Sequence, residues 1–138
     1  MGNVFPDHYF RIRENGALVF RVETEPRTQR TELEQIASVN IKNGEIKPTG
    51  NRALGAEDTA AIQSWIAARK AQLSRREIDD ILRTVDHLNL TTQWAQSRAS
   101  DEELEAVTVA LLLSMHDLRN VLVRKQSERL EQARPEAG

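Results

Sequence analysis

One segment, residues 105–116, constrains the fold more than any other, because its apolar side chains would point to all sides of a helix. One helical stripe has three- and four-residue spacing and consists of Leu104, Val107, Leu111, Met115, Leu118 and Leu122. Val109, Leu112 and Leu113 cover the other side of the same helix. A helix that is apolar on every side is normally buried on every side. We therefore expect this helix to lie at the centre of an assembly that needs a second copy of the chain.

The length and charge of the chain limit its class. Its 138 residues are the size of one ordinary domain, and 39% of them are hydrophobic, which is enough for a core. The formal net charge is -2, and acidic residues balance or outnumber basic ones along most of the chain. No segment is strongly basic, so the long-range attraction that drives nucleic-acid binding is missing.

The absence of cysteine excludes disulfides, thiolate catalysis and zinc–thiolate sites, and it fits a reducing compartment. The first residues have neither the basic nor the apolar region of a signal peptide. Gly2 suggests myristoylation, but Pro6 stands where that pattern needs Ser or Thr. The longest uninterrupted apolar run is too short to cross a bilayer. We expect a cytoplasmic protein that does not enter a membrane.

Residues 9–24 have the pattern of a β-hairpin around Asn15-Gly16. An Asn-Gly pair between strand-like runs is typical of a two-residue turn in which both residues take positive φ. Such a turn pairs Glu14 with Ala17 and fixes the faces of the hairpin. One face then carries Tyr9, Leu18, Phe20 and Val22 with Arg11 and Arg13, and the other carries Phe10, Ile12, Val19 and Arg21. Neither face is purely polar, so we expect both to be partly covered.

A second hairpin is predicted around Asn43-Gly44, after a loop at residues 25–30 and a run of β-formers at residues 31–41. This turn pairs Ile41 with Ile46. Pro48 is expected to end the sheet, because proline cannot donate a hydrogen bond to the ladder. The result is a short antiparallel meander of three or four strands.

Helices follow a loop at residues 48–55. The first is predicted to begin near Ala56, and a second is indicated by the capping-box pattern that starts at Ser74. Nothing in residues 72–76 forbids a helix, so the sequence leaves open whether these two are continuous. The main apolar stripe of the second stretch consists of Ile78, Ile81, Leu82, Val85 and Leu88, with a smaller patch at His87, Leu90 and Trp94.

Another capping box, from Ser100 to Glu103, starts a long helix that is predicted to run to about residue 133. We expect it to pack antiparallel to the preceding helix across a short turn at residues 98–100. The predicted fold is therefore α+β, a meander of three or four strands followed by an antiparallel bundle of two or three helices. It forms one domain over residues 1–138, with a sheet part (1–50), a helical part (56–133) and a frayed tail (134–138).

The histidines His8, His87 and His116 are the first candidates for acid–base chemistry or metal binding. In an antiparallel helical hairpin, His87 and His116 would be offset by about 7 Å along the helix axis, too far apart to share one zinc ion. We expect no catalytic residue, no metal ligand and no cofactor-binding residue among them.

Other catalytic and binding motifs are missing as well. Ser114 lies between Leu113 and Met115 on a helix, rather than on the glycine-flanked turn that holds a nucleophilic serine. The glycines do not form a phosphate-binding motif. Arginines and aromatics alternate on the first hairpin, as in some nucleic-acid platforms, but glutamates on the same hairpin cancel the charge. We expect those aromatics to pack on helices, with the arginines at the rim.

The sequence therefore favours a small, non-enzymatic protein that associates with itself through its helices and serves as a protein-interaction or adaptor module. The alternative is a pocket protein that binds or transforms a small ligand between the sheet and the helices. Residues expected to line such a pocket are Trp65, His87, Trp94 and His116.

Overall fold

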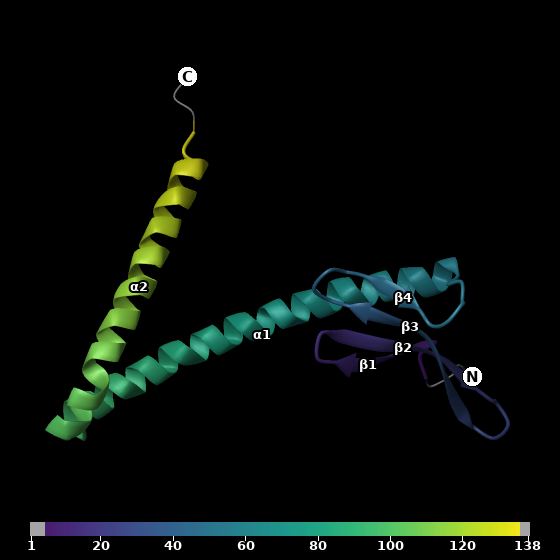
Figure 1. Ribbon diagram of the computed structural model, residues 1–138, viewed down its shortest axis with the longest axis horizontal. Coiled ribbons are helices and arrows are strands. Elements are labelled where there is room, and N and C mark those ends of the chain that lie inside the picture. The colour runs from purple at the N-terminus through teal and green to yellow at the C-terminus, as the bar shows by residue number, and fades with distance from the viewer. Residues whose placement is uncertain (1–4, 136–138) are drawn as a thin grey trace. The chain divides into compact units, whose positions relative to one another are not determined.

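The computed structural model describes residues 5–135. Gly2, with its incomplete myristoylation pattern, and the tail residues 136–138 lie outside the described residues. The elements are β1 (His8–Arg13), β2 (Gly16–Thr24), β3 (Thr31–Asn40), β4 (Ile46–Pro48), α1 (Ala56–Ser97) and α2 (Asp101–Ala133) (Figure 1). The predicted α+β class is confirmed, because an antiparallel four-stranded sheet precedes two helices.

The sheet is a meander with the strand order β1-β2-β3-β4, and every strand pairs antiparallel with its neighbour in sequence. The loops at residues 25–30 and 49–55 lie between elements as predicted, and β4 ends at Pro48.

The predicted register of the first hairpin is wrong by two residues. Ala17 pairs with Ile12 rather than with Glu14, so the turn consists of Glu14 and Asn15. The two faces are nevertheless as predicted, because side chains alternate with a period of two and a shift of two residues preserves them. Tyr9 pairs with Phe20 on one face, and Phe10 pairs with Val19 on the other.

Gly16 is needed for a different reason from the one that the turn pattern suggested. It is the first residue of β2 and does not take positive φ. A Cβ atom at Gly16 would instead lie 1.9 Å from the carbonyl oxygen of Val39 in β3. The close approach of two strands therefore requires glycine at this position.

The second hairpin is also shifted by two residues. Ile46 pairs with Val39 rather than with Ile41, and residues 41–45 form the loop. The Asn40 amide donates a hydrogen bond to the Glu45 carbonyl oxygen (2.9 Å). Gly44 takes a φ of 72°, so here positive φ accounts for the glycine.

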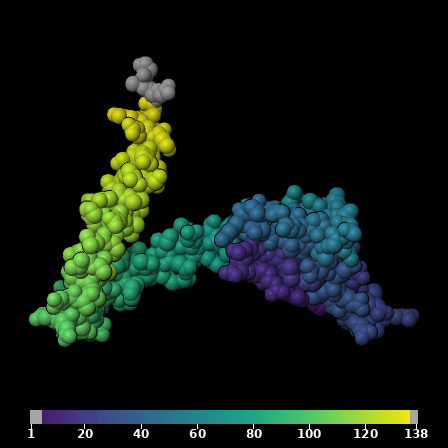
Figure 2. All heavy atoms as spheres, in the orientation of Figure 1, coloured from purple at the N-terminus to yellow at the C-terminus, as the bar shows by residue number. Residues whose placement is uncertain are grey.

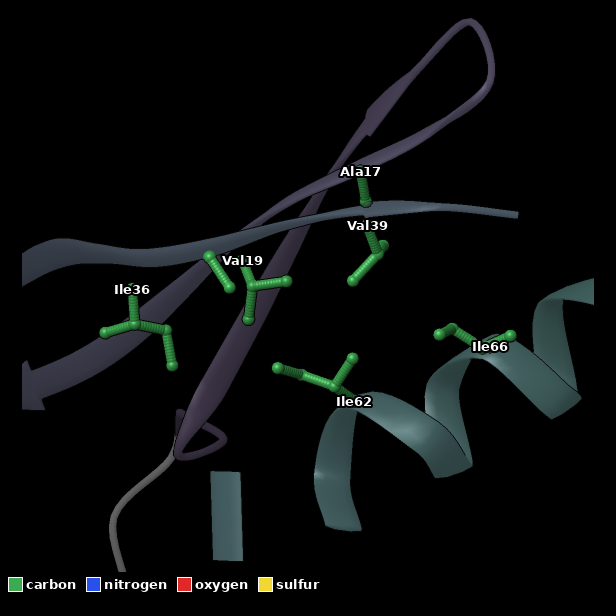
Figure 3. Packing of buried hydrophobic residues seen from close by; sticks show 7 residues of the cluster. Ala17, Val19, Ile36, Val39, Ile62 and Ile66 are labelled. Atoms are coloured by element: carbon green, nitrogen blue, oxygen red, sulfur yellow. The ribbon is translucent and has the colours of Figure 1, made fainter. Parts of the chain in front are cut away.

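The hydrophobic core lies between the sheet and the beginning of α1. Figure 3 shows side chains of β2 and β3 directed towards two isoleucines of α1. The buried cluster consists of Ala17, Val19, Ile36, Ala37, Val39, Ile62 and Ile66. Phe10 and Trp65 close its edge, with their rings stacked at a centroid distance of 4.8 Å and an interplanar angle of 1°.

A β-bulge makes this core continuous along β3. Val19 pairs with Ala37, but Phe20 pairs with Gln35, so Ile36 is an extra residue in β3. A bulge changes which side chains face a given side of the sheet. Ile36 and Ala37 are consecutive in sequence, yet both are fully buried in the cluster.

α1 is a single continuous helix of 42 residues, which settles the alternative that the sequence left open. No proline or glycine interrupts residues 56–97. The capping pattern at Ser74 therefore lies inside a helix. Each amide there already has an intrahelical acceptor, so the cap has no free donor to bind.

The capping box at the start of α2 is present. The Glu103 amide donates to the Ser100 hydroxyl (3.1 Å), and the Ser100 amide donates to the Glu103 carboxylate (3.0 Å). These bonds with Ser100 lower the pKa of the Glu103 carboxyl. The helix begins after the turn at residues 98–100, as predicted.

The chain divides within α1 into two compact units, Met1–Ile81 and Leu82–Gly138. We call them the N-terminal and the C-terminal unit. The N-terminal unit holds the sheet and the hydrophobic core. The C-terminal unit consists of the last part of α1 and of α2. The expected single domain stays a prediction.

We expect Gly16→Asn to lower the free energy of unfolding by about 1–3 kcal/mol, because its Cβ atom forces β2 and β3 apart. Gly44→Asn is the matched control. Nothing lies within 4 Å of a Cβ atom at Gly44, and asparagine tolerates positive φ, so a small effect is expected there. Urea denaturation of both variants measures the difference. Equal losses at the two positions would contradict the steric explanation.

Candidate interaction surface

The C-terminal unit carries apolar side chains that its own fold does not bury. Within the described part of the chain, α2 contains no buried residue. Its large apolar side chains that are exposed are Val109, Leu112, Leu113, Met115, Leu118, Val121, Leu122, Val123 and Leu130. Figure 2 shows the surface of α2 in green to yellow. The helix that was expected to lie at the centre of an assembly is thus uncovered in the single chain.

The last part of α1 has the same property. Leu82, Val85 and Leu90 are all close to half or more exposed, at 57%, 49% and 62%. In the N-terminal unit, α1 packs on the sheet through Ile62 and Ile66. Ile62 and Ile66 are the apolar residues of α1 that the structure shows as buried.

An open groove of about 570 Å³ lies between the end of α1 and the beginning of α2. α1 contributes Leu88 and Trp94 to its wall, and α2 contributes Leu104, Leu111 and Met115. The groove wall is mostly apolar and has no charged side chain. This arrangement brings Trp94 to the first apolar stripe of α2, although the stripe stays half-exposed or exposed.

Polar side chains in the middle of α2 bond within the helix. Asn120 Nδ2 lies 3.0 Å from His116 Nε2. The Ser114 hydroxyl donates to the carbonyl oxygens of Ala110 (2.9 Å) and Leu111 (3.1 Å). A serine hydroxyl that donates to carbonyl oxygens of its own helix has its hydrogen bond within that helix and is not positioned as a nucleophile.

Of the residues expected to line a pocket, Trp65 belongs to the N-terminal unit, and the other three belong to the C-terminal unit. Trp65 packs against Phe10 at the edge of the core, and Trp94 lines the groove in the other unit. Neither His87 nor His116 belongs to the groove wall. Among the described residues, no group of three or more histidines and carboxylates is placed to hold a metal ion.

A buried charged cluster, which the sequence interpretation missed, lies at the start of α1. Asp58 is only 6% exposed. His8 Nε2 donates to Asp58 Oδ1 (2.7 Å), and an Arg21 guanidinium nitrogen donates to Oδ2 (2.7 Å). His8 and Arg21 are directly paired on β1 and β2, so the sheet supplies both donors to one carboxylate of the helix.

The hydrogen bond from His8 and the bond and charge of Arg21 lower the pKa of the Asp58 carboxyl, against the opposing effect of burial. An acidic residue in the first turn suits the positive end of a helix dipole, which explains an acid at position 58 but not its partners. The available signal was the predicted hairpin face that carries Arg21 with Phe10 and Val19. A charged residue on a core-facing side normally has a buried partner.

The outer face of the sheet carries the other arginine and aromatic residues. The Arg11 guanidinium lies 4.5 Å from the centre of the Phe20 ring and 5.8 Å from that of Tyr9. The expected packing of aromatics on helices is thus found for Phe10, while Tyr9 and Phe20 pack on each other under Arg11. Arg11 therefore makes cation–π contacts with both rings.

By length and composition, α2 could cross a membrane. Its most apolar 18-residue window has a mean hydropathy of 1.4, and none of that window is buried. Asp117 and Arg119 nevertheless lie in the middle of this helix.

No protein-family model matches the chain, and no curated protein or solved structure is detectably similar to it.

We expect Asp58→Asn to lower the free energy of unfolding by about 1–3 kcal/mol at neutral pH, because two donors lose the charge of their buried acceptor. The effect should depend on pH. The folded-state pKa of Asp58 is below its ordinary value of 3.8, so its contribution is complete above that pH and is lost as the pH falls below it. Unfolding curves of wild type and variant should therefore converge in acid.

Glu34→Gln is the matched control, because Glu34 also pairs with an arginine, Arg52, but on the exposed surface. Exposed pairs contribute about 0–1 kcal/mol. A Glu34→Gln loss as large as that of Asp58→Asn, or an Asp58→Asn difference that persists unchanged at low pH, would contradict the role of the buried cluster.

Proposed function

We propose that the protein is a non-enzymatic, self-associating interaction module, whose C-terminal unit forms an antiparallel helical bundle with a second copy of the chain. The uncovered apolar surface of α2 carries this proposal. Burying apolar surface contributes roughly 25 cal/mol per Å². Burial of the nine exposed large apolar side chains of the 33-residue helix α2 would therefore strongly favour association. Contiguous apolar patches of this kind mark interaction surfaces.

A second copy accounts for this surface better than a membrane does. Asp117 and Arg119 would each cost about 2.5–3.5 kcal/mol near the centre of a bilayer. In a helical bundle the same side chains can lie at the edge of the interface and reach water. We further propose that the protein is cytoplasmic, which its cysteine-free composition fits. A further protein partner can bind the assembled module.

The groove supports a second candidate function, the binding of a small apolar ligand. Its volume of about 570 Å³ lies in the usual range of ligand sites, and Trp94 offers an aromatic wall. The groove is open along its length, whereas ligand sites bury most of the ligand surface. Because the open groove does not enclose a ligand in this way, self-association is the primary proposal.

Light scattering coupled to size exclusion tests the proposal directly. We expect a mass of at least twice the 15.7 kDa of one chain at micromolar concentration. A mass of one chain across the whole concentration range would overturn the proposal and favour the ligand-binding alternative. In that case, the next measurement would be the binding of a fluorescent apolar dye to the groove. Bound dye would quench or shift the fluorescence of Trp94.

We expect Leu113→Ala to weaken association and to make the thermal midpoint more dependent on protein concentration, because stability of an assembly follows mass action. Leu113 is 61% exposed in the single chain, so its truncation removes little packing within one subunit. Leu33→Ala is the matched control, because Leu33 is also an exposed leucine (44%) but lies on the sheet. A Leu113→Ala loss that does not vary over a hundredfold concentration range would contradict the proposal.

A further inference from the structure

A second face of α2, which we call the His116 seam, has the spacing of a coiled-coil interface. It consists of Val109, Leu113, His116, Asn120, Val123 and Leu130. The steps of four, three, four, three and seven residues keep these side chains in line along a helix that pairs with another helix. The seam is uncovered, since Val109, Leu113 and Leu130 are 66%, 61% and 68% exposed.

Charge is divided between the two halves of α2. Residues 101–117 contain five acidic residues and no lysine or arginine, whereas residues 118–134 contain five basic and two acidic residues. This division also suits the dipole of a single helix. Between two helices, however, it distinguishes the two possible directions. Antiparallel copies bring each acidic half beside a basic half, and parallel copies bring like charges together.

From these two features we infer that two copies of α2 pair antiparallel along the His116 seam, with His116 of each copy beside Asn120 of the other around a two-fold axis. The inference rests on the proposed self-association and adds to it the surface, the direction and the register. In this pairing Leu113 of one copy lies opposite Val123 of the other, on both sides of the axis. The seam is self-complementary, as a two-fold interface requires.

The polar pair sets the register. His116 and Asn120 already bond to each other within one helix (3.0 Å), so they can exchange or share hydrogen bonds with the same pair in the second copy. Sliding the copies by seven residues in one direction places His116 opposite Leu113 and Asn120 opposite Val109, and sliding them in the other places Asn120 opposite Val123. Polar groups would then be buried without partners, which costs about 1–3 kcal/mol for each group. Single polar layers in otherwise apolar seams specify alignment in this way.

The chain has no cysteine, so engineered cysteines report the pairing without background. Leu113→Cys and Val123→Cys are purified separately with tags of different size, mixed, and oxidised mildly. We expect the mixture to give about tenfold more disulfide-linked dimer of mixed composition than either variant gives alone, because a disulfide needs Cβ atoms about 4 Å apart. The matched control mixes Val109→Cys with Val123→Cys, positions that the inferred register offsets by about 6 Å.

The outcomes separate this inference from the proposed function. Efficient disulfide formation by Leu113→Cys alone indicates parallel pairing and overturns the inference. Equal yields from the Val109→Cys and Leu113→Cys mixtures overturn the register. If the cysteine variants keep the mass of a dimer by light scattering but no mixture cross-links, association uses another face, and the inference fails while the proposed function stands. The mass of one chain in the wild-type protein overturns both.

Discussion

The structure depends on the packing of two isoleucines, Ile62 and Ile66, against one face of a four-stranded sheet. These are the buried apolar side chains that the 42-residue helix α1 contributes to the described core. Around them the sheet supplies Val19, Ile36 and Val39. The described core is therefore small, and it lies in the N-terminal unit. In the described part of the chain, the rest of α1 and the whole of α2 contribute no buried residue to this core.

Features that depend on neighbouring residues could be predicted from the sequence, and features that depend on distant residues could not. Elements follow from local signals, and the strands, the loops and the cap at Ser100 were found where turn, proline and capping residues indicated them. The hairpin faces were also correct, because they depend only on the alternation of side chains. Registers were wrong by two residues in both hairpins, because an Asn-Gly pair was assumed to form the turn itself. In the first hairpin Gly16 is instead the first residue of β2, where the carbonyl oxygen of Val39 leaves no room for a Cβ atom.

Long-range polar partners were beyond the reach of sequence patterns. The helix dipole accounts for an acid at position 58, but nothing in the spacing of residues indicates that His8, fifty residues earlier, bonds to it. The bulge at Ile36 is equally hidden, since an extra residue in a strand leaves no composition signal. In contrast, the all-round apolar character of α2 was evident from the sequence. The structure adds that the single chain leaves this helix uncovered, which is the basis for proposing a second copy rather than a larger core.

The meander has a consequence for how the protein is made. Because each strand pairs with the strand that precedes it, the sheet and the two isoleucines that pack on it are complete once Ile66 has been synthesised. Domains fold as units during translation, beginning at the N-terminus. The N-terminal unit thus has all its partners while the ribosome is still adding α2. α2 leaves the ribosome after the N-terminal unit. Under the proposed self-association, the cellular concentration of the protein would govern how long its apolar surface is open to chaperones and proteases.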